Sequence, residues 1–275
     1  MLNARDHSRD SAGLLYVYPV VSRRAGGVSL GINLNPNNAC NWACVYCQVP
    51  DLTRGGPPPL DLARLRQELT GFLAPAALAV FMAEQVPEAS RRLVDVAFSG
   101  NGEPTSAPEF AEAVSQVVAV LAEFGLRVPI RLITNGSLLH RPEVQRGIAE
   151  LGVNEGEVWF KVDRMTDTGS REINGVPLQA EAVRQRLQRC AELAPTWVQT
   201  CYFRRDGALP GGEEEAAYLE LLGECREGLR GVQLYGIARA SYQPGAERLA
   251  PATVAEIEAF AGKIRALGLA VNVAP

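Results

Sequence analysis

The chain has 275 residues, a formal net charge of −4 and a hydrophobic share of 47%, enough for the core of one large α/β domain or two small ones. No run of apolar residues is long enough for a transmembrane helix, and the polar start "MLNARDHSRDSAG" lacks the apolar segment of a secretory signal. The acidic balance argues against a nucleic-acid partner, although it is compatible with a local basic patch. Six cysteines, half of them in one cluster, favour metal or redox chemistry in a reducing cytoplasm over a disulfide scaffold.

Along the chain, residues 1–27 are interpreted as an N-terminal tail or extension, and residues 28–275 as a single domain. Short β-like segments alternate there with helical stretches. The predicted strands are 28–34, 94–99, 129–134, 157–163, 197–203, 232–238 and 269–273. The predicted helices lie near 60–85, 108–124, 141–151, 178–193, 213–228 and 252–267. This alternation indicates parallel strands with right-handed crossovers, and it predicts an α/β fold: a partial (β/α)6 TIM-like barrel, with a doubly wound sheet as the alternative.

The predicted strands have one apolar face and one mixed or polar face. In 28–34, for example, Val28, Leu30 and Ile32 alternate with Ser29 and Gly31. A strand between two helix layers is expected to be apolar on both faces, so the pattern favours a barrel with a polar lumen. The loops that leave the strands are long (35–59, 164–177, 204–212 and 239–251). The candidate site is therefore expected at the C-terminal ends of the strands.

Three cysteines, Cys40, Cys44 and Cys47, lie in the first of these loops within the stretch "CNWACVYC". Stray buried thiols rarely cluster so closely. A structural zinc site needs four ligands, and the two histidines, His7 and His140, lie in the tail and about a hundred residues away. A [4Fe–4S] cluster with one iron left unligated by protein fits three thiolates better.

The spacing resembles the CxxxCxxC signature of the radical S-adenosylmethionine (SAM) enzymes, with Tyr46 as the aromatic residue before the last cysteine. The stretch "FSGNGEPT" (98–105) follows the second strand, where this family carries its GGE-type motif, with Asn101 in place of the first glycine. "ITNGS" (133–137) and "FKVD" (160–163) end the next two strands, as in many members. The resemblance implies one [4Fe–4S] cluster on the three cysteines, and SAM as the missing ligand through its amino and carboxylate groups.

Residues 21–48 are similar to a subgroup related to the tRNA wybutosine synthesis enzymes. Those enzymes carry further N-terminal cysteines for a second cluster, and residues 1–39 contain none. A single cluster is therefore expected, and the tRNA substrate is not transferred to this chain.

Other polar side chains of the predicted lumen are candidates for contacts with SAM or substrate. Lys161 and Asp163 share a strand face, and the alternative for them is a structural ion pair. Gln199 and Arg239 are lumen candidates as well, and the alternative is that such groups satisfy one another. The full set of candidate contacts is Tyr46, Ser99, Gly100, Asn101, Gly102, Glu103, Asn135, Lys161, Asp163, Gln199 and Arg239.

The resulting hypothesis is a cytoplasmic radical SAM enzyme that cleaves SAM reductively and abstracts hydrogen from a substrate, with a flavodoxin or ferredoxin as the electron donor implied by the family. A small polar molecule is the expected substrate. The enzymatic alternatives are a glycyl-radical activase and a tRNA-modifying enzyme, and the non-enzymatic alternative is an iron–sulfur or zinc sensor.

Overall fold

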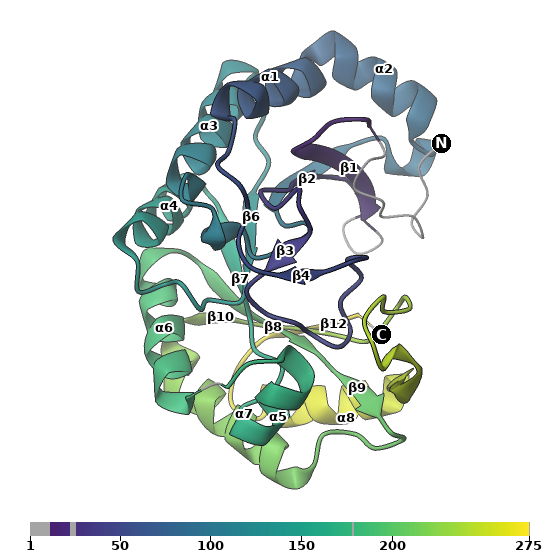
Figure 1. Cartoon of the computed structure of the whole chain (residues 1–275), viewed down its shortest axis with the longest axis vertical. Coiled ribbons are helices and arrows are strands. Elements are labelled where there is room, and N and C mark those ends of the chain that lie inside the picture. The colour runs from purple at the N-terminus through teal and green to yellow at the C-terminus, as the bar shows by residue number, and fades with distance from the viewer. Residues whose placement is uncertain (1–11, 23–25, 178, 275) are drawn as a thin grey trace.

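An eight-stranded sheet curls into an open barrel in the computed structural model, which describes residues 12–22, 26–177 and 179–274 (Figure 1). Seven strands run parallel and confirm the seven predicted segments: β2 (Gly27–Ile32), β5 (Leu93–Phe98), β6 (Ile130–Thr134), β7 (Glu157–Lys161), β8 (Thr196–Cys201), β10 (Leu229–Tyr235) and β12 (Val271–Ala274). The eighth, β1 (Val17–Ser22), pairs antiparallel with β2. The sequence did not predict it, and it lies within the predicted extension, of which residues 1–11 and 23–25 are outside the described part.

The helices cover the outer face of the sheet, so the partial barrel forms and not the doubly wound alternative. They are α1 (Leu62–Leu73), α2 (Pro75–Gln85), α3 (Phe110–Glu123), α4 (Pro142–Val153), α5 (Asp167–Asn174), α6 (Ala180–Leu193), α7 (Gly212–Cys225) and α8 (Val254–Arg265). Six of them contact one another in succession along the rim in Figure 1, in the order α1, α3, α4, α6, α7 and α8. Helix α5, in a segment predicted to be a loop, lies apart from this layer.

The predicted helix 60–85 is two helices because of one proline. Pro75 begins α2, and Ala74 before it adopts an extended conformation (φ −53°, ψ 130°) that ends α1. A residue before proline is sterically driven out of the helical region, whereas proline is well suited to the first helical turn.

The core lies between the sheet and the helices, on the face that the alternation assigned to it. Leu30, Val96, Leu132, Val158 and Val198 occupy this face of five neighbouring strands and are all fully buried. They belong to one continuous hydrophobic cluster. Burial of this face fixes the register of each strand, because a shift by one residue would turn the apolar side chains into the lumen.

The opposite face is polar, and charged side chains fill its N-terminal end. Arg131 of β6 forms ion pairs with Asp95 of β5 and with Glu157 of β7, the latter at 2.6 Å. Ser29 of β2 donates a hydrogen bond to Asp95. Arg131 also lies 5.2 Å from the centre of the Trp159 ring. These charges satisfy one another, so the base of the barrel is closed and the C-terminal end is left for a site.

A buried carboxylate attaches the unexpected strand to the helix layer. Glu68 of α1 accepts hydrogen bonds from the backbone N–H groups of Leu15, Tyr16 and Val17, at 3.0, 2.8 and 3.2 Å. Arg64 donates a further bond from its side chain at 2.9 Å. The chain that enters β1 is therefore held by one side chain of the following helix.

This contact makes stability depend on pH. Burial acts to raise the pKa of Glu68, but the hydrogen bonds from Leu15, Tyr16 and Arg64 outweigh it and hold the pKa below its ordinary value of 4.5. The charged form therefore contributes stability above the unfolded pKa, and this contribution is lost as the pH falls through the folded pKa.

We expect Glu68→Gln to lower the free energy of unfolding at pH 7 by about 1.5–3 kcal/mol, since bonds to a charged acceptor are lost. Urea denaturation at a series of pH values measures it. The difference from the wild type should shrink as the pH falls below 4.5. Glu84→Gln, at an exposed residue of α2, is the control for loss of charge. A difference independent of pH would contradict the role of the carboxylate.

Candidate functional site

The cysteine loop (residues 35–59) follows β2 at the C-terminal end of the barrel, and the part with β3 (Ala39–Cys40) and β4 (Thr53–Arg54) crosses the middle of the view in Figure 1. Its three cysteines are free thiols and partly exposed, whereas Cys190, Cys201 and Cys225 are buried core residues. Burial raises the pKa of Cys40 to about 11 and that of Cys44 to about 12, and the charge of Cys47 adds to both shifts. Cys47 therefore lies close enough to both other thiols to act on them electrostatically.

The arrangement of these thiols bears on the kind of metal group that they could bind. Among the residues that the structure describes, no three His, Cys, Asp or Glu side chains converge on one metal ion. Tetrahedral zinc would hold its thiolates about 3.8 Å apart. A cubane binds each thiolate through a different iron and so tolerates a wider spacing. The difference between zinc and a cluster at this site therefore lies in how far apart the three sulfurs are held.

The turn after β5 packs tightly against the start of the cysteine loop. A Cβ atom on Gly102 would lie 2.1 Å from the carbonyl oxygen of Ala39 and 2.7 Å from the side chain of Asn35. Asn35 itself donates to the Ala39 carbonyl at 3.0 Å. Asn33 accepts hydrogen bonds from the backbone N–H groups of Asn35 and Asn101, both at 3.1 Å. Position 102 must therefore be glycine for the two segments to approach this closely.

Glu103 joins the ends of β5 and β6 through a buried carboxylate. Its Oε1 accepts from the Thr105 backbone (3.1 Å) and from the hydroxyls of Thr105 and Thr134 (both 2.6 Å), and its Oε2 accepts from the Asn135 backbone (2.7 Å). Burial raises the pKa of Glu103, and these bonds oppose the rise. Oε2 accepts only one of these four bonds, so it retains capacity for a further donor.

Amide side chains connect the two strand ends to the cysteine loop. Asn135 donates to Asn41 at 2.8 Å, and Asn41 donates to Ser137 at 2.8 Å. Asn101 donates to Asn38 at 2.6 Å. The Oδ1 atom of Asn101 is buried and has no hydrogen-bond partner within the described part of the chain. A buried acceptor without a donor is costly, so this atom is a candidate contact for a bound ligand.

Tyr46 of the cysteine loop contacts the end of β7. Its hydroxyl donates to Oδ2 of Asp163, and the ammonium of Lys161 lies 4.8 Å from the centre of its ring. Asp163 also accepts from the Cys201 backbone N–H at 3.0 Å. No ion pair joins Lys161 to Asp163 in the described residues, yet the two groups interact: burial acts to lower the pKa of Lys161, but the charges of Tyr235 and Asp163 outweigh it and raise the pKa. Its ammonium also makes a cation–π contact with the tyrosine of the cysteine motif.

The remaining predicted residues lie on the same face but at different depths. Ser99, before Gly100, bonds the hydroxyl of Tyr18 at 2.8 Å. Gln199 is buried on β8 and lies beside Lys161 in the sheet register. Arg239 follows β10 and lines a pocket of about 290 Å³ together with Ile237, Ala238, Ala240, Ser241, Ala246, Leu249 and Pro251.

This pocket borders the cysteine loop. The hydroxyl of Ser241 donates to the carbonyls of Val45 (2.7 Å) and Cys47 (3.0 Å), and Gln243 donates to the carbonyl of Val49 at 2.7 Å. The segment after β10 thus binds the end of the loop, a contact that sequence reasoning did not predict.

Sequence reasoning also missed the supports on the other side of the loop. Arg54 donates to the carbonyls of Asn41 and Gly175, and α5 lies against the loop where no helix was expected. The stretch "NLNPNNACN" (33–41) did contain a signal for such supports. Short amide side chains like these asparagines commonly form hydrogen bonds with the backbone N–H and carbonyl groups of irregular loops.

Comparisons with known proteins agree with this geometry. A model of the radical SAM superfamily matches residues 34–160. A UPF0026 protein of Methanocaldococcus jannaschii is 34% identical over 157 residues, which are 57% of this chain and 42% of that protein. The chain spans less than half the length of the curated relatives that it matches.

Two solved structures share the fold. SuiB of Streptococcus suis, bound to S-adenosylmethionine, aligns over 91% of this chain and 47% of its own, with a TM-score of 0.55 and 11% identity. TYW1 with a lysine-pyruvate adduct aligns over 88% of this chain and 74% of its own, with a TM-score of 0.52 and 16% identity. Residues 34–160, which include the three cysteines, thus match the radical SAM superfamily, and the curled half-barrel shares its fold with these two structures.

Proposed function

We propose that this protein is a radical SAM enzyme that holds one [4Fe–4S] cluster on Cys40, Cys44 and Cys47 and abstracts hydrogen from a small polar substrate in the barrel. The observation that carries the proposal is the position of three free, partly exposed cysteines at the C-terminal end of the strands. When bound, the cluster supplies the electron for reductive cleavage of SAM to methionine and a 5′-deoxyadenosyl radical. The protein supplies binding, orientation and exclusion of water.

The turn after β5 is the proposed site for the amino group of SAM. The unpartnered Oδ1 of Asn101 and the Oε2 of Glu103 are acceptors, and an ammonium is a donor. The glycines Gly100 and Gly102 bring this backbone against the start of the cysteine loop, with Gly100 at a φ of 141° that favours glycine. Ser99 and Asn135 hold the two flanking strand ends in place.

The end of β7 is the proposed site for the carboxylate or ribose of SAM, or for the substrate. Lys161 keeps an ammonium at the lumen face without an ion pair to Asp163, and Gln199 offers an amide beside it. Tyr46 and Asp163 bond each other and so fix the cysteine loop next to this ammonium. The ammonium also interacts with the charge of Asp163, and a buried cation is stabilised further by an anionic ligand group.

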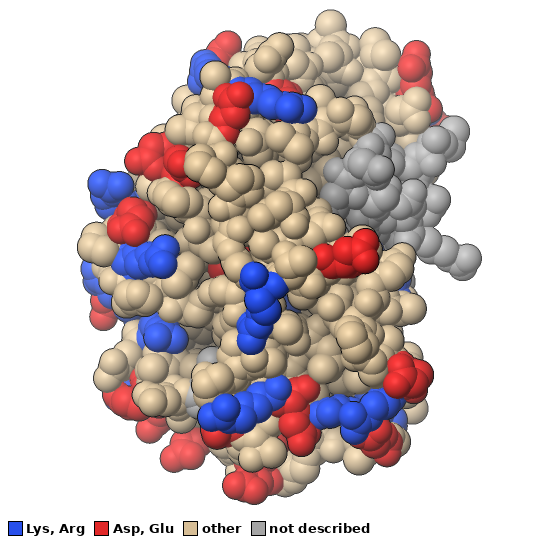
Figure 2. All heavy atoms as spheres, viewed as in Figure 1, with Lys and Arg blue, Asp and Glu red and all other residues tan. Residues whose placement is uncertain are grey.

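The substrate is proposed to be small or medium in size and to carry a carboxylate or phosphate near Arg239. The pocket of about 290 Å³ beside the cysteine loop has Arg239 among mostly apolar and small residues. On the face seen in Figure 2, basic and acidic side chains are interspersed, and the basic ones do not gather into a patch. Such a face suits a small anion better than an RNA backbone.

The further assignments also remain proposals. The reductant is proposed to be a flavodoxin or ferredoxin, the location the cytoplasm, and the domain a single unit over residues 28–275. Within the described residues, no helix combines the length and the apolar composition required to cross a bilayer.

We expect Gly102→Ala to reduce cluster loading strongly, because the added methyl group would meet the Ala39 carbonyl directly before Cys40. The measurement is iron content after anaerobic reconstitution, where wild type should carry about four irons per chain. Gly71→Ala, in α1 with open space around it, is the matched control and should load normally. Normal iron in Gly102→Ala would contradict the close approach, and about eight irons in wild type would contradict a single cluster.

The reduced holoprotein should convert SAM to 5′-deoxyadenosine and methionine, detected by chromatography. Glu103→Gln should weaken SAM binding by roughly tenfold or more, since a charge-assisted hydrogen bond contributes about 1.5–3 kcal/mol. Calorimetry on cluster-loaded protein measures the affinity, with Glu84→Gln as the control. Intact cluster without any 5′-deoxyadenosine would favour a sensor, whereas unchanged SAM affinity in Glu103→Gln would remove that residue from the binding site.

The small-substrate proposal predicts weak RNA binding with a shallow dependence on salt. Fluorescence anisotropy with a labelled tRNA between 50 and 200 mM salt tests it, a range over which true phosphate binders lose roughly 10³–10⁵ in affinity. Tight binding with a steep slope, unchanged in Arg239→Ala, would favour a tRNA-modifying enzyme. Arg23 and Arg24, the basic pair that such an enzyme would use here, lie outside the described residues.

A further inference from the structure

The C-terminal end of α5 binds the middle of the cysteine loop through its backbone. The carbonyl of Asn174 accepts from the N–H of Ala43 at 3.0 Å, and that of Ile173 accepts from the N–H of Val45 at 2.9 Å. The last carbonyls of a helix have no partner within the helix, so the loop satisfies them. Gly175, in the left-handed region at a φ of 69°, ends the helix at this contact.

The side chain of Asn174 lies between two acceptors. Its Nδ2 is 3.3 Å from Sγ of Cys44 and 2.8 Å from Oδ2 of Asp163. A thiolate and a carboxylate only accept hydrogen bonds, so the amide nitrogen must face both of them. As a result the Oδ1 atom of Asn174 is buried without a partner in the described residues. The side chain keeps a costly unpaired oxygen in order to direct both N–H groups at the thiol and the carboxyl group.

The contact with Cys44 shows what this amide does. Its N–H group brings a partial positive charge to the sulfur, with Nδ2 at 3.3 Å from Sγ. The carboxylate of Asp163, which accepts from the same amide, places a negative charge nearby. Asn174 therefore favours negative charge on the sulfur of Cys44 at a position where the neighbouring carboxylate opposes it.

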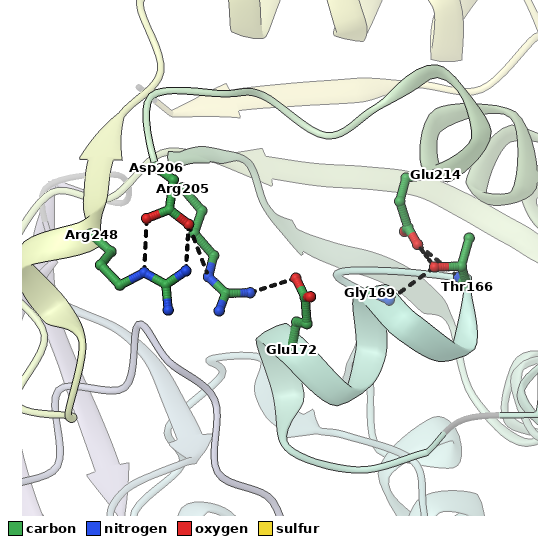
Figure 3. Close-up of polar contacts among 7 residues, drawn as sticks. All are labelled: Thr166, Gly169, Glu172, Arg205, Asp206, Glu214 and Arg248. Carbon is green, nitrogen blue, oxygen red and sulfur yellow. Dashed lines mark hydrogen bonds and ion pairs between the residues drawn. The ribbon is translucent and has the colours of Figure 1, made fainter.

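Two sets of polar contacts hold α5 in place, and Figure 3 shows both. At its start, Thr166 caps the helix by accepting from the N–H of Gly169 at 2.9 Å. Glu214 of α7 accepts from the backbone N–H groups of Met165 (3.1 Å) and Thr166 (3.0 Å) and from the Thr166 hydroxyl. The beginning of α5 is therefore attached to the helix layer.

The second set is a row of ion pairs that begins at the exposed Glu172 of α5 and leads away from the helix. Glu172 pairs with Arg205 of β9 (Phe203–Arg205) at 2.6 Å, and Arg205 lies 3.9 Å from Asp206. Asp206 in turn pairs with Arg248 at 2.6 Å, next to β11 (Leu249–Pro251), which pairs with β9. With both ends fixed, α5 presents Asn174 to Cys44 in a defined position.

We propose that Asn174 is a positioning residue that raises the reduction potential of the cluster by donating a hydrogen bond to the thiolate of Cys44; this rests on the proposed function, which places the cluster there. Hydrogen bonds to the sulfurs are among the factors that set cluster potentials. One-electron reduction of [4Fe–4S]²⁺ to [4Fe–4S]⁺ adds a negative charge, and the donor stabilises the reduced form more than the oxidised form.

The test compares Asn174→Ala and Asn174→Leu with the wild type as reconstituted holoproteins without SAM. Both variants remove the donor and keep the backbone carbonyl that binds Ala43. A potentiometric titration with dithionite as the electron source, followed by electron paramagnetic resonance, measures the potential. We expect both variants to shift to more negative potentials. Arg171→Ala is the matched control, since Arg171 lies exposed on the same helix and pairs only with Asp167 at 2.9 Å, and it should keep the wild-type potential.

Three outcomes would overturn the inference. Wild-type potentials in both Asn174 variants, with full iron content, would show that the hydrogen bond does not tune the cluster. Loss of the cluster from both variants, with normal loading of Arg171→Ala, would show that Asn174 holds the loop and does not set the potential. A wild type that takes up no cluster would overturn the proposed function itself, and iron analysis before the titration distinguishes this case.

Discussion

The constraint on which this structure depends is that the cysteine loop has little regular secondary structure of its own. The backbone N–H and carbonyl groups that it buries and does not pair within itself need partners from elsewhere. Ser241 supplies one for Cys47, and Gln243 one for Val49. The carbonyls at the end of α5 supply two more. The thiols are therefore placed by polar contacts with several different strand ends, and the barrel is the scaffold that brings those ends together.

The lumen face of the sheet has charged side chains at both ends, and the two ends differ in how these charges are paired. At the base, Arg131 pairs with Asp95 and Glu157, and the charges cancel within the sheet. At the C-terminal end, Glu103 is surrounded by neutral donors, and Lys161 lies over an aromatic ring. The charges at the base are thus paired directly with one another, whereas those at the mouth contact neutral donors and an aromatic ring. Sequence alternation shows that a face is polar, but it does not show which of its charges pair.

The strands and the place of the cysteine loop could be predicted because each rests on a local pattern. Val96 and Phe98 alternate with polar residues, and the cysteine spacing is a property of eight residues. Strand β1 was missed because it is buried on both faces and reads as part of a tail, and its attachment depends on Glu68, more than fifty residues away. Helix α5 was missed because it is only eight residues long, and its ends are held by tertiary contacts.

Several residues that hold the cysteine loop by hydrogen bonds lie in the second half of the chain. The superfamily model matches residues 34–160, and the three cysteines fall inside that range. Asp163, Asn174 and Ser241 all lie beyond it, and each bonds directly to the loop. Part of the environment of the sulfurs therefore comes from the second half of the barrel, beyond the matched region. The first half provides the ligands and contributes contacts of its own, such as the Trp42 backbone N–H that donates to Cys40.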